Sequence, residues 1–454
     1  MNLKKIFTLL ALVGISAPSF ATNGMDLEGY GPVAAAMGGA SFAYDNGAGA
    51  MMNNPATLGL MGQGSGIGVA LGFLGPKVNS SATSSGGDAY YMPAIGYVTR
   101  HGDLTYGIGV YSQGGMGTEY GANSPMAYGT GDNIRSEVGV GRIILPLAYN
   151  VNDKLIIGGS LDWVWATMDM KMAASTPQFM AMATGNMSPG FGNMLMNPGT
   201  GLISRYGADA FRIDFSDNNA FTGKASGSGF AGKLGVVYKV SPSLSVGATY
   251  HAKTRLSDLT TDGNGASFSA FKAGASLGPA LTGKITIHDF QWPETYGLGL
   301  AYQINDKWLV AADYKRIDWS GVMQDFKMTF STGPDYADFR ISQNWENQNV
   351  FMIGAAYRMS EALTLRFGGN FANNPVPDNR VNPLFPAIIK DQYTLGFGYL
   401  LNRQSGIDFS LVYAPKVTVT GTQTANVPYS GAPDNATTIS HSQLNWQLQY
   451  GHHF

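Results

Sequence analysis

Six segments of the chain repeat one plan: a strand-like stretch with a tyrosine shortly before its end, a polar turn of two to five residues, and a second stretch in which apolar and polar residues alternate. These segments are Ile95 to Tyr111, Leu147 to Trp163, Val236 to Tyr250, Leu300 to Tyr314, Ala355 to Phe371 and Phe397 to Tyr413. Their turns are built from Asn, Asp, Ser, Gly and Pro, which tolerate tight backbone geometry. The repeat predicts six β-hairpins.

The alternation assigns a face of the sheet to each residue. Because successive side chains of a strand point to opposite faces, Leu161 and Leu365 lie on the apolar face of their strands, whereas Ser160, Asp162 and Arg366 lie on the polar face. Such strands are typical of a transmembrane barrel, whose outer face contacts lipid while its inner face lines the lumen. A soluble β-sandwich also alternates, but it would not combine a signal peptide with short turns on one side only.

The composition supports strands rather than helices as the membrane-crossing elements. Charged residues make up 13% of the chain, against roughly 25% in a soluble domain, yet the mean hydropathy is only −0.04. After the N-terminus no apolar run approaches the roughly 18–20 residues that a transmembrane helix requires. The net charge of −2 gives no reason to expect a nucleic acid as a partner.

The hairpins lead to an all-β fold, an antiparallel transmembrane barrel of fourteen strands. Six hairpins supply twelve strands, and residues 64–75 and 440–454 add one at each end. The longer intervening segments then become extracellular loops: roughly 76–88, 112–133, 171–222, 257–282, 320–338, 373–388 and 419–438. The last strand ends on Phe454, as in outer-membrane proteins that the barrel assembly machinery recognises. We also expect contacts with outer-membrane lipid and lipopolysaccharide, and a monomer.

The N-terminus has the pattern of a secretory signal peptide, residues 1–21. Lys4 and Lys5 form the basic start, residues 6–15 form a short apolar core, and a small-x-small cleavage pattern ends at Ala21. These features predict an outer-membrane protein of a Gram-negative cell. There is no cysteine, so disulfides and thiol chemistry are excluded.

Residues 22–62 do not alternate and are rich in Gly, Ala and Met. This segment is too apolar for a solvated tail, and small residues let it pack closely against a wall. We therefore expect three parts: the signal peptide at 1–21, a hatch at 22–62 that plugs the lumen, and the barrel at 63–454, with notable loops at 171–222 and 257–282. A disordered periplasmic tail is the alternative for the second part.

The hatch resembles that of a known family. The stretch GYGPVAAAMGGA at residues 29–40, followed by Asp45 and by Asn54, Pro55 and Ala56, is similar to the N-terminal hatch of the FadL/TodX family of long-chain fatty acid and hydrocarbon transporters. The resemblance implies a fourteen-stranded barrel and a hatch containing the Asn-Pro-Ala motif. It also implies that loops capture the substrate, which passes to an inner site and leaves sideways at a kink in the third strand.

That third strand corresponds here to residues 103–111, with Gly107 and Gly109 as the candidate lateral-exit positions. Glycine inside a strand marks a bulge or a close approach of another backbone. Gly114 and Gly115 follow directly. We expect Asn54, Pro55 and Ala56 to touch the wall near this strand.

Candidate ligand-binding residues are apolar side chains in two long loops: Phe179, Met180, Phe191, Met194, Leu195, Phe268 and Phe271. Exposed apolar patches mark binding grooves, although the same side chains could simply pack the loops together. For a carboxylate, Arg366 and Lys315 are the candidate cations on the lumen face. Lys315 could instead pair with Asp313, and a neutral hydrocarbon gains weight if neither cation lines the pocket.

The sequence leaves two other functions open, a general polar porin and an outer-membrane hydrolase. A porin would lack an ordered plug, and the six histidines show no Ser–His–Asp spacing that supports hydrolysis, so we expect no enzyme. We expect no metal and no cofactor, because adjacent strand residues such as His452 and His453 point to opposite faces. Uptake of a long-chain fatty acid, with aromatic or alkane hydrocarbons as the alternative, is the favoured function.

Overall fold

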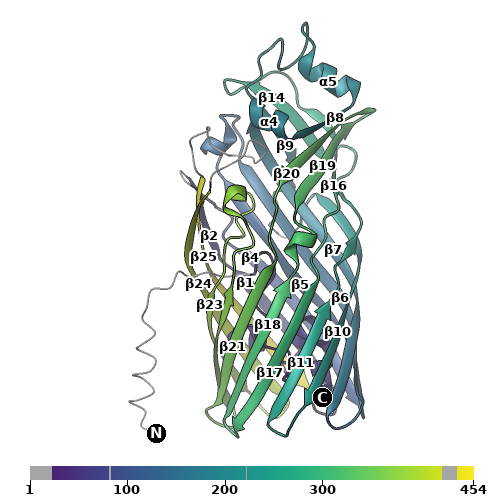
Figure 1. Ribbon diagram of the computed structural model, residues 1–454, viewed down its shortest axis with the longest axis vertical. Helices are drawn as coiled ribbons and strands as arrows, with labels where there is room; N and C mark the ends of the chain where they lie inside the picture. Colours follow the sequence, from purple (N-terminus) through teal and green to yellow (C-terminus); the bar gives the residue numbers. More distant parts are fainter. Residues whose placement is uncertain (1–22, 81–82, 221, 422–436) are drawn as a thin grey trace.

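The structure is a computed structural model that describes residues 23–80, 83–220, 222–421 and 437–454. In this part of the chain, 25 strands form one antiparallel sheet that closes into a tall barrel (Figure 1). The predicted signal peptide, residues 1–21, lies outside the described residues. Among the described residues, no helix is long and apolar enough to cross a membrane.

The barrel wall is a circuit in which each strand pairs with the next, and the last pairs with the first. In order, its strands are β1 (Gly64–Leu74), β4 (Tyr90–His101), β5 (Leu104–Tyr120), β6 (Ile134–Asn150), β7 (Leu155–Ser175), β10 (Ala225–Lys239), β11 (Leu244–His251), β17 (Thr295–Asn305), β18 (Trp308–Ile317), β21 (Gln348–Arg358), β22 (Leu363–Ala372), β23 (Gln392–Leu400), β24 (Ser405–Gly421) and β25 (Thr437–His453). At the closure Gly66 faces His453 and Phe73 faces Trp446. The six predicted hairpins supply twelve of these strands.

The predicted strand count is wrong for the sheet as a whole. We expected fourteen strands, but the sheet contains 25 in the described residues. The fourteen expected strands form the circuit, and the others lie largely in segments predicted to be loops. They are β2 (Pro76–Ser80), β3 (Thr83–Ser84), β8 (Ala183–Met187), β9 (Ala210–Phe215), β12 (Arg255–Leu256), β13 (Leu259–Thr260), β14 (Ala266–Lys272), β15 (Ala275–Ser276), β16 (Leu281–His288), β19 (Asp325–Thr332) and β20 (Asp335–Ser342).

These additional strands extend the sheet above the barrel at its extracellular end. From β7 the pairing continues through β9, β14, β16, β19 and β20 to β8. Two short helices, α4 (Thr176–Met182) and α5 (Pro189–Met196), lie at the top of the same region (Figure 1). Some of these strands, such as β8 and β9, pair with strands distant in sequence, which leaves no hairpin signature. Others, such as β19 and β20, form a hairpin inside a segment predicted to be a loop.

The outer face of the circuit is apolar, as the alternation predicts. Leu161 is 58% exposed and Leu298 is 63% exposed, whereas Asp162, between Leu161 and Trp163, is completely buried. Leu365 is exposed, and the neighbouring Arg366 reaches Asp408 on β24. Because lipid covers such a face, its exposed apolar side chains are in their preferred surroundings. The strand register read from the sequence is confirmed at these positions.

Residues 23–62 lie against the inner side of the wall. This segment forms α2 (Pro32–Ala36), η1 (Gly47–Gly49), α3 (Ala50–Asn53) and η2 (Pro55–Leu60), and most of its residues are buried. The helix α2 contacts β22 to β25, and η2 contacts β6, β7 and β10. A row of small residues explains the close approach, since Ala34, Ala35 and Ala36 are fully buried. The segment therefore occupies the lumen.

The lipid-facing assignment can be tested with one substitution at two places. Leu161→Arg should reduce the folded barrel, because a cation near the middle of the bilayer costs about 2–4 kcal/mol. Leu401→Arg is the control: Leu401 is about as exposed (50%) but lies in a short turn after β23, where a charge meets water. The measurement is the folded fraction in isolated outer membranes by electrophoresis of unheated samples. Equal loss in both variants would contradict the register.

Candidate functional site

The wall of the barrel is interrupted between β4 and β5. These strands stop pairing after Ala94 and Tyr111. Beyond this pair, residues 90–93 of β4 pair with β1, and residues 112–120 of β5 pair with β6. The two neighbouring strands thus separate in their extracellular halves and leave a window in the wall.

The window forms because β5 turns toward the N-terminal segment. The pairing of β5 with β6 shifts register between Ser112 and Gly114, and Asp26 forms a β-bridge with Gly114. The backbone N–H of Gly115 donates to the carbonyl oxygen of Met25 at 3.2 Å. A β-carbon at Gly114 would overlap that same oxygen, so only glycine permits this approach.

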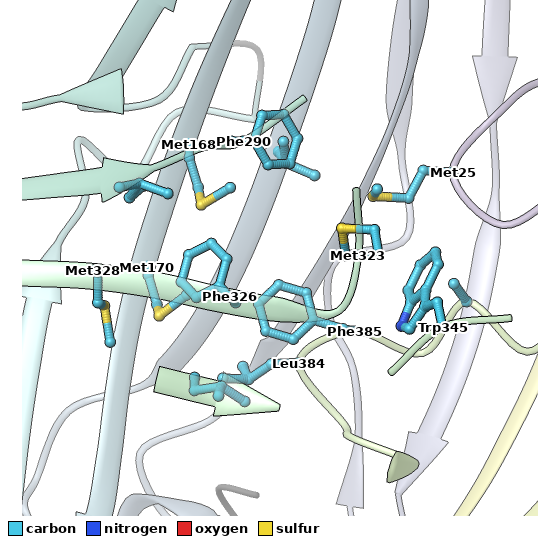
Figure 2. Packing of buried hydrophobic residues seen from close by; sticks show 14 of the residues in the cluster. Met25, Met168, Met170, Phe290, Met323, Phe326, Met328, Trp345, Leu384 and Phe385 are labelled. Atoms are coloured by element: carbon cyan, nitrogen blue, oxygen red, sulfur yellow. The ribbon is translucent and has the colours of Figure 1, made fainter. Parts of the chain in front are cut away.

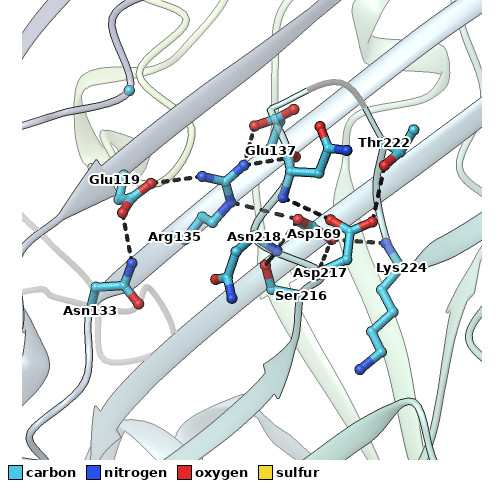
Figure 3. A network of polar contacts seen from close by, with 12 residues as sticks. Glu119, Asn133, Arg135, Glu137, Asp169, Ser216, Asp217, Asn218, Thr222 and Lys224 are labelled. Carbon is cyan, nitrogen blue, oxygen red and sulfur yellow. Dashed lines mark hydrogen bonds and ion pairs between the residues drawn. The ribbon is translucent and has the colours of Figure 1, made fainter.

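The upper rim of the window is closed by the segment that precedes β4. The N–H of Gly86 donates to the carbonyl oxygen of Glu119 at 2.7 Å, and the N–H of Glu119 donates to the hydroxyl of Ser85 at 3.0 Å. Above β5, Arg135 binds Glu119 at 2.7 Å and Glu137 at 2.6 Å (Figure 3). The window is therefore bounded below by paired strands and above by a hydrogen-bonded and ion-paired rim.

A cavity of about 460 Å³ lies at the window. Its lining includes Met25 and Leu27 of the N-terminal segment as well as Leu71 and Tyr91, which are 40% and 45% exposed on the outer face of the wall. Other lining residues are Met92, Pro93, Ser112, Val138, Val140, Trp165, Pro386, Ala387, His441 and Gln443. Because residues of the lumen and of the lipid-facing surface share this lining, the cavity connects the two.

The predicted exit positions lie beside the window, and the break itself is elsewhere. Gly107 faces Val98 and Gly109 faces Gly96 in the paired part of β4 and β5. The register shift falls at Gly114 instead. The sequence contained the signal, a Gly-Gly pair, but glycine is common throughout this chain, and nothing local marked the position at which another backbone approaches.

A chamber of buried charges lies beside the window, inside the barrel. Asp162 binds Arg142 at 2.8 Å and also pairs with Lys233, and all three side chains are almost completely buried. The guanidinium of Arg142 also donates to the side chain of Gln113, next to the break in β5. The space enclosed here is about 20 Å³, the size of a water molecule. Burial raises the pKa of Glu28, which lines the chamber, to about 7.

Both predicted carboxylate-binding cations have protein partners. Arg366 donates to Asp408 at 2.7 Å, and Lys315 binds Asp26 of the N-terminal segment at 3.0 Å. The suggested pair of Lys315 with Asp313 does not form. Asp313 instead accepts hydrogen bonds from the backbone N–H groups of Ser41 and Phe42, at 2.6 and 2.9 Å. These contacts hold the N-terminal segment to β18.

The Asn-Pro-Ala motif lies mainly against β7 and β10, and η2, which begins at Pro55, also contacts β5, so the expected contact of the motif with residues 103–111 stays a prediction. The side-chain amide of Asn54 donates to the carbonyl oxygens of Phe42 at 2.8 Å and Val236 at 3.4 Å. A β-carbon at Gly158 would lie 2.6 Å from the backbone nitrogen of Ala56. The wall is therefore free of side chains where the motif meets it, which explains its position.

The apolar residues predicted in the loops come together as an aromatic cluster above the barrel. Phe268 lies 5.6 Å from Phe179 and 5.2 Å from Phe191, measured between ring centroids. These three rings and Leu195 are buried, Met194 and Phe271 are partly buried, and Met180 is exposed. The arrangement matches the alternative that these side chains pack the loops together.

A second apolar region, which the sequence analysis missed, lies between this cluster and the N-terminal segment. Figure 2 shows methionines and aromatic rings, including Met25, Met170 and Phe326, gathered around the buried loop at 381–389. The ring of Phe385 in that loop lies 5.6 Å from the ring of Phe326. The run VNPLFPAII at 381–389, apolar within a segment predicted to be extracellular, was the available signal.

Comparison with known proteins agrees with this architecture. The model of a family described as outer membrane protein transport protein (OMPP1/FadL/TodX) matches residues 10–448. The crystal structure of the toluene transporter TbuX of Ralstonia pickettii is 31% identical with a TM-score of 0.75, covering 94% of this chain and 99% of that chain. The P. putida toluene transporter TodX is 30% identical with a TM-score of 0.80 and the same coverage.

Curated sequence relatives match over shorter stretches. Outer membrane protein P1 of Haemophilus influenzae is 24% identical over 185 residues, which is 41% of this chain. An uncharacterised protein of Chlorobium limicola is 56% identical over 72 residues, or 16% of this chain. The chain spans 35–38% of the length of these relatives.

The close approach at the break in β5 can be tested with alanine. Gly114→Ala should destabilise the protein by about 1–3 kcal/mol, the usual effect of overpacking, because its β-carbon would displace Met25. Gly121→Ala is the control, since a β-carbon there meets nothing within 4 Å. The measurement is the midpoint of thermal unfolding of the purified protein in detergent. An unchanged midpoint for Gly114→Ala would contradict the contact.

Proposed function

Because this chain belongs to the OMPP1/FadL/TodX family of outer-membrane transport proteins, we propose that it carries hydrophobic small molecules across the outer membrane and releases them sideways through the window between β4 and β5. The observation that carries the proposal is the cavity of about 460 Å³, whose lining combines residues of the lumen with residues of the lipid-facing surface. A hydrocarbon in this cavity reaches the membrane without crossing water.

The proposed route begins in the apolar region between the extracellular loops and the N-terminal segment. Met25 belongs to this region (Figure 2) and also lines the window cavity. A ligand that passes from the apolar region into the window cavity therefore stays in contact with apolar side chains. Since exposing apolar surface costs roughly 25 cal/mol per Å², a continuously apolar path keeps the barrier low.

The straight route through the lumen is closed in this proposal. Residues 22–62 act as a hatch. Two contacts hold the hatch to the wall: the ion pair of Lys315 with Asp26, and the hydrogen bonds that Asp313 accepts from the backbone N–H groups of Ser41 and Phe42. The ion pairs of Arg142, Lys233 and Asp162 fill the space beside the hatch with charge. A hydrocarbon is excluded from this chamber because its lining is charged, and the lumen beside the hatch leaves no room for a wide polar pore. This arrangement argues against a general porin.

Monoaromatic hydrocarbons are the substrate class that we favour. The similar solved structures at about 30% identity are titled as toluene transporters and monoaromatic hydrocarbon channels. The two cations expected to bind a carboxylate, Arg366 and Lys315, each have an acidic partner. A neutral ligand needs no such cation, so the paired cations support an uncharged substrate.

A long-chain fatty acid is the second candidate, and one observation favours it. Arg142 and Lys233 share the single carboxylate of Asp162, so these two cations could also bind the carboxylate of a ligand. The enclosed space there is about 20 Å³, however, which accommodates no alkyl chain. A fatty acid would therefore require the hatch to move.

The two substrate classes can be separated by uptake. Cells with this protein as their only family member should accumulate labelled toluene faster than cells without it, whereas labelled oleate should enter both at the same rate. The expected difference follows from the pairing of Arg366 and Lys315. Faster entry of oleate but not toluene would reverse the assignment. Equal entry of both compounds in both strains would contradict transport itself.

The window can be tested by filling it. Ser112→Trp places an indole in the cavity and should reduce hydrocarbon uptake to the level of cells without the protein, because the sideways exit is blocked. Ser257→Trp, at an exposed extracellular position outside the cavity, is the control. Uptake of labelled hydrocarbon is measured at equal amounts of folded barrel. Normal uptake in the Ser112 variant would place the exit elsewhere.

A further inference from the structure

One polar group in the window cavity has no partner. His441 on β25 is 5% exposed and lines the cavity together with Pro386 and Gln443. Its Nδ1 lies 2.9 Å from the carbonyl oxygen of Pro386. Its other ring nitrogen, Nε2, is buried and has no hydrogen-bond partner among the described residues. Because buried polar atoms are almost always hydrogen-bonded, we expect Nε2 of His441 to bind a polar group of a ligand.

The partner of Nδ1 determines what Nε2 can do. A carbonyl oxygen only accepts hydrogen bonds, so Nδ1 must carry the hydrogen. In a neutral imidazole the second nitrogen then carries a lone pair and accepts. Nε2 of His441 is therefore suited to a ligand that donates a hydrogen bond. A carboxylate has no hydrogen to donate, and a plain hydrocarbon leaves Nε2 unpaired.

The other lining residues determine the polarity of such a ligand. Most lining residues are apolar or glycine, among them Met25, Leu27, Val138 and Trp165. The one carboxylate in the lining, Glu137, is bound by Arg135. The cavity is thus largely apolar with an unpaired acceptor at His441. Its ligand is complementary when it has an apolar body and a single hydroxyl group.

We propose that His441 is a specificity-determining residue that accepts a hydrogen bond from a hydroxyl group of the ligand. The protein would then take hydroxylated hydrocarbons, such as phenols and hydrophobic alcohols, in preference to the parent hydrocarbons. This inference rests on the proposed function, because it uses the window cavity as the transport route. It adds a substrate class that differs from the parent hydrocarbon by one donor.

Toluene and p-cresol test the proposal directly, because they differ by one hydroxyl group. In cells with this protein as their only family member, the half-saturation concentration for uptake is measured for each compound. His441→Phe keeps a flat ring and removes both nitrogens. The value for p-cresol should rise roughly 2- to 10-fold, the effect of one hydrogen bond, whereas the value for toluene should stay unchanged.

Two further variants make the result specific. His441→Gln retains an acceptor oxygen and should restore part of the p-cresol uptake. His101→Phe repeats the ring substitution at an exposed histidine at the end of β4 and should alter neither compound. The amount of folded barrel is measured in every strain.

The outcomes separate this proposal from the proposed function. Equal changes for toluene and p-cresol in His441→Phe would assign His441 a structural role and overturn the inference, as would unchanged uptake of both. A larger effect on a labelled carboxylate than on p-cresol would show that the ring acts as a cation, which also overturns it. If the unaltered protein takes up neither compound, the proposed transport function itself fails.

Discussion

The structure depends on the requirement that backbone N–H and C=O groups in a bilayer be paired within the protein. The circuit from β1 to β25 meets it by closing the sheet. The window is the place where this closure is relaxed, since β4 and β5 separate after Ala94 and Tyr111. The N-terminal segment compensates in part: Met25 accepts from the backbone of Gly115, and Asp26 bridges to Gly114. The opening in the wall and the N-terminal segment inside the barrel are therefore linked by the same hydrogen bonds.

Charged side chains take part in this attachment, although they lie next to the largely apolar window cavity. The N-terminal segment packs apolar side chains such as Met51 and Leu58 against the wall, and polar contacts add to this attachment. Asp313 accepts hydrogen bonds from two backbone N–H groups of the N-terminal segment, and Lys315 binds Asp26 of the same segment. Removing one partner of such a buried pair leaves an uncompensated charge, which costs about 3–5 kcal/mol. The N-terminal segment is consequently held in register with β18, close to the residues that shape the window.

Features with a local period could be predicted from the sequence, and features made by contacts between distant segments could not. The alternation around Leu161 and Asp162 places each on the correct face, because the period of a strand is a property of neighbouring residues. The strand β19 lies in the segment predicted to be a loop at 320–338, and it pairs with β16, about 40 residues earlier in the chain. The contact of Ala56 with β7 depends on Gly158 being a glycine, and no pattern around either residue indicates the other. The family motif could be recognised, but its position against the wall required the structure.

The same distinction bears on substrate choice. The position of Arg366 on the lumen face makes it a reasonable partner for a carboxylate, but Asp408 on β24, two strands away in the sheet, forms an ion pair with it. His441 attracted no notice in the sequence, because a single histidine in an alternating strand has no motif. The carbonyl oxygen of Pro386 accepts the hydrogen bond of Nδ1, so Nε2 is left as an unpaired acceptor in a largely apolar lining. In a cavity of this kind most of the affinity comes from apolar contact, which distinguishes ligands weakly, whereas one unpaired acceptor distinguishes those that can donate to it.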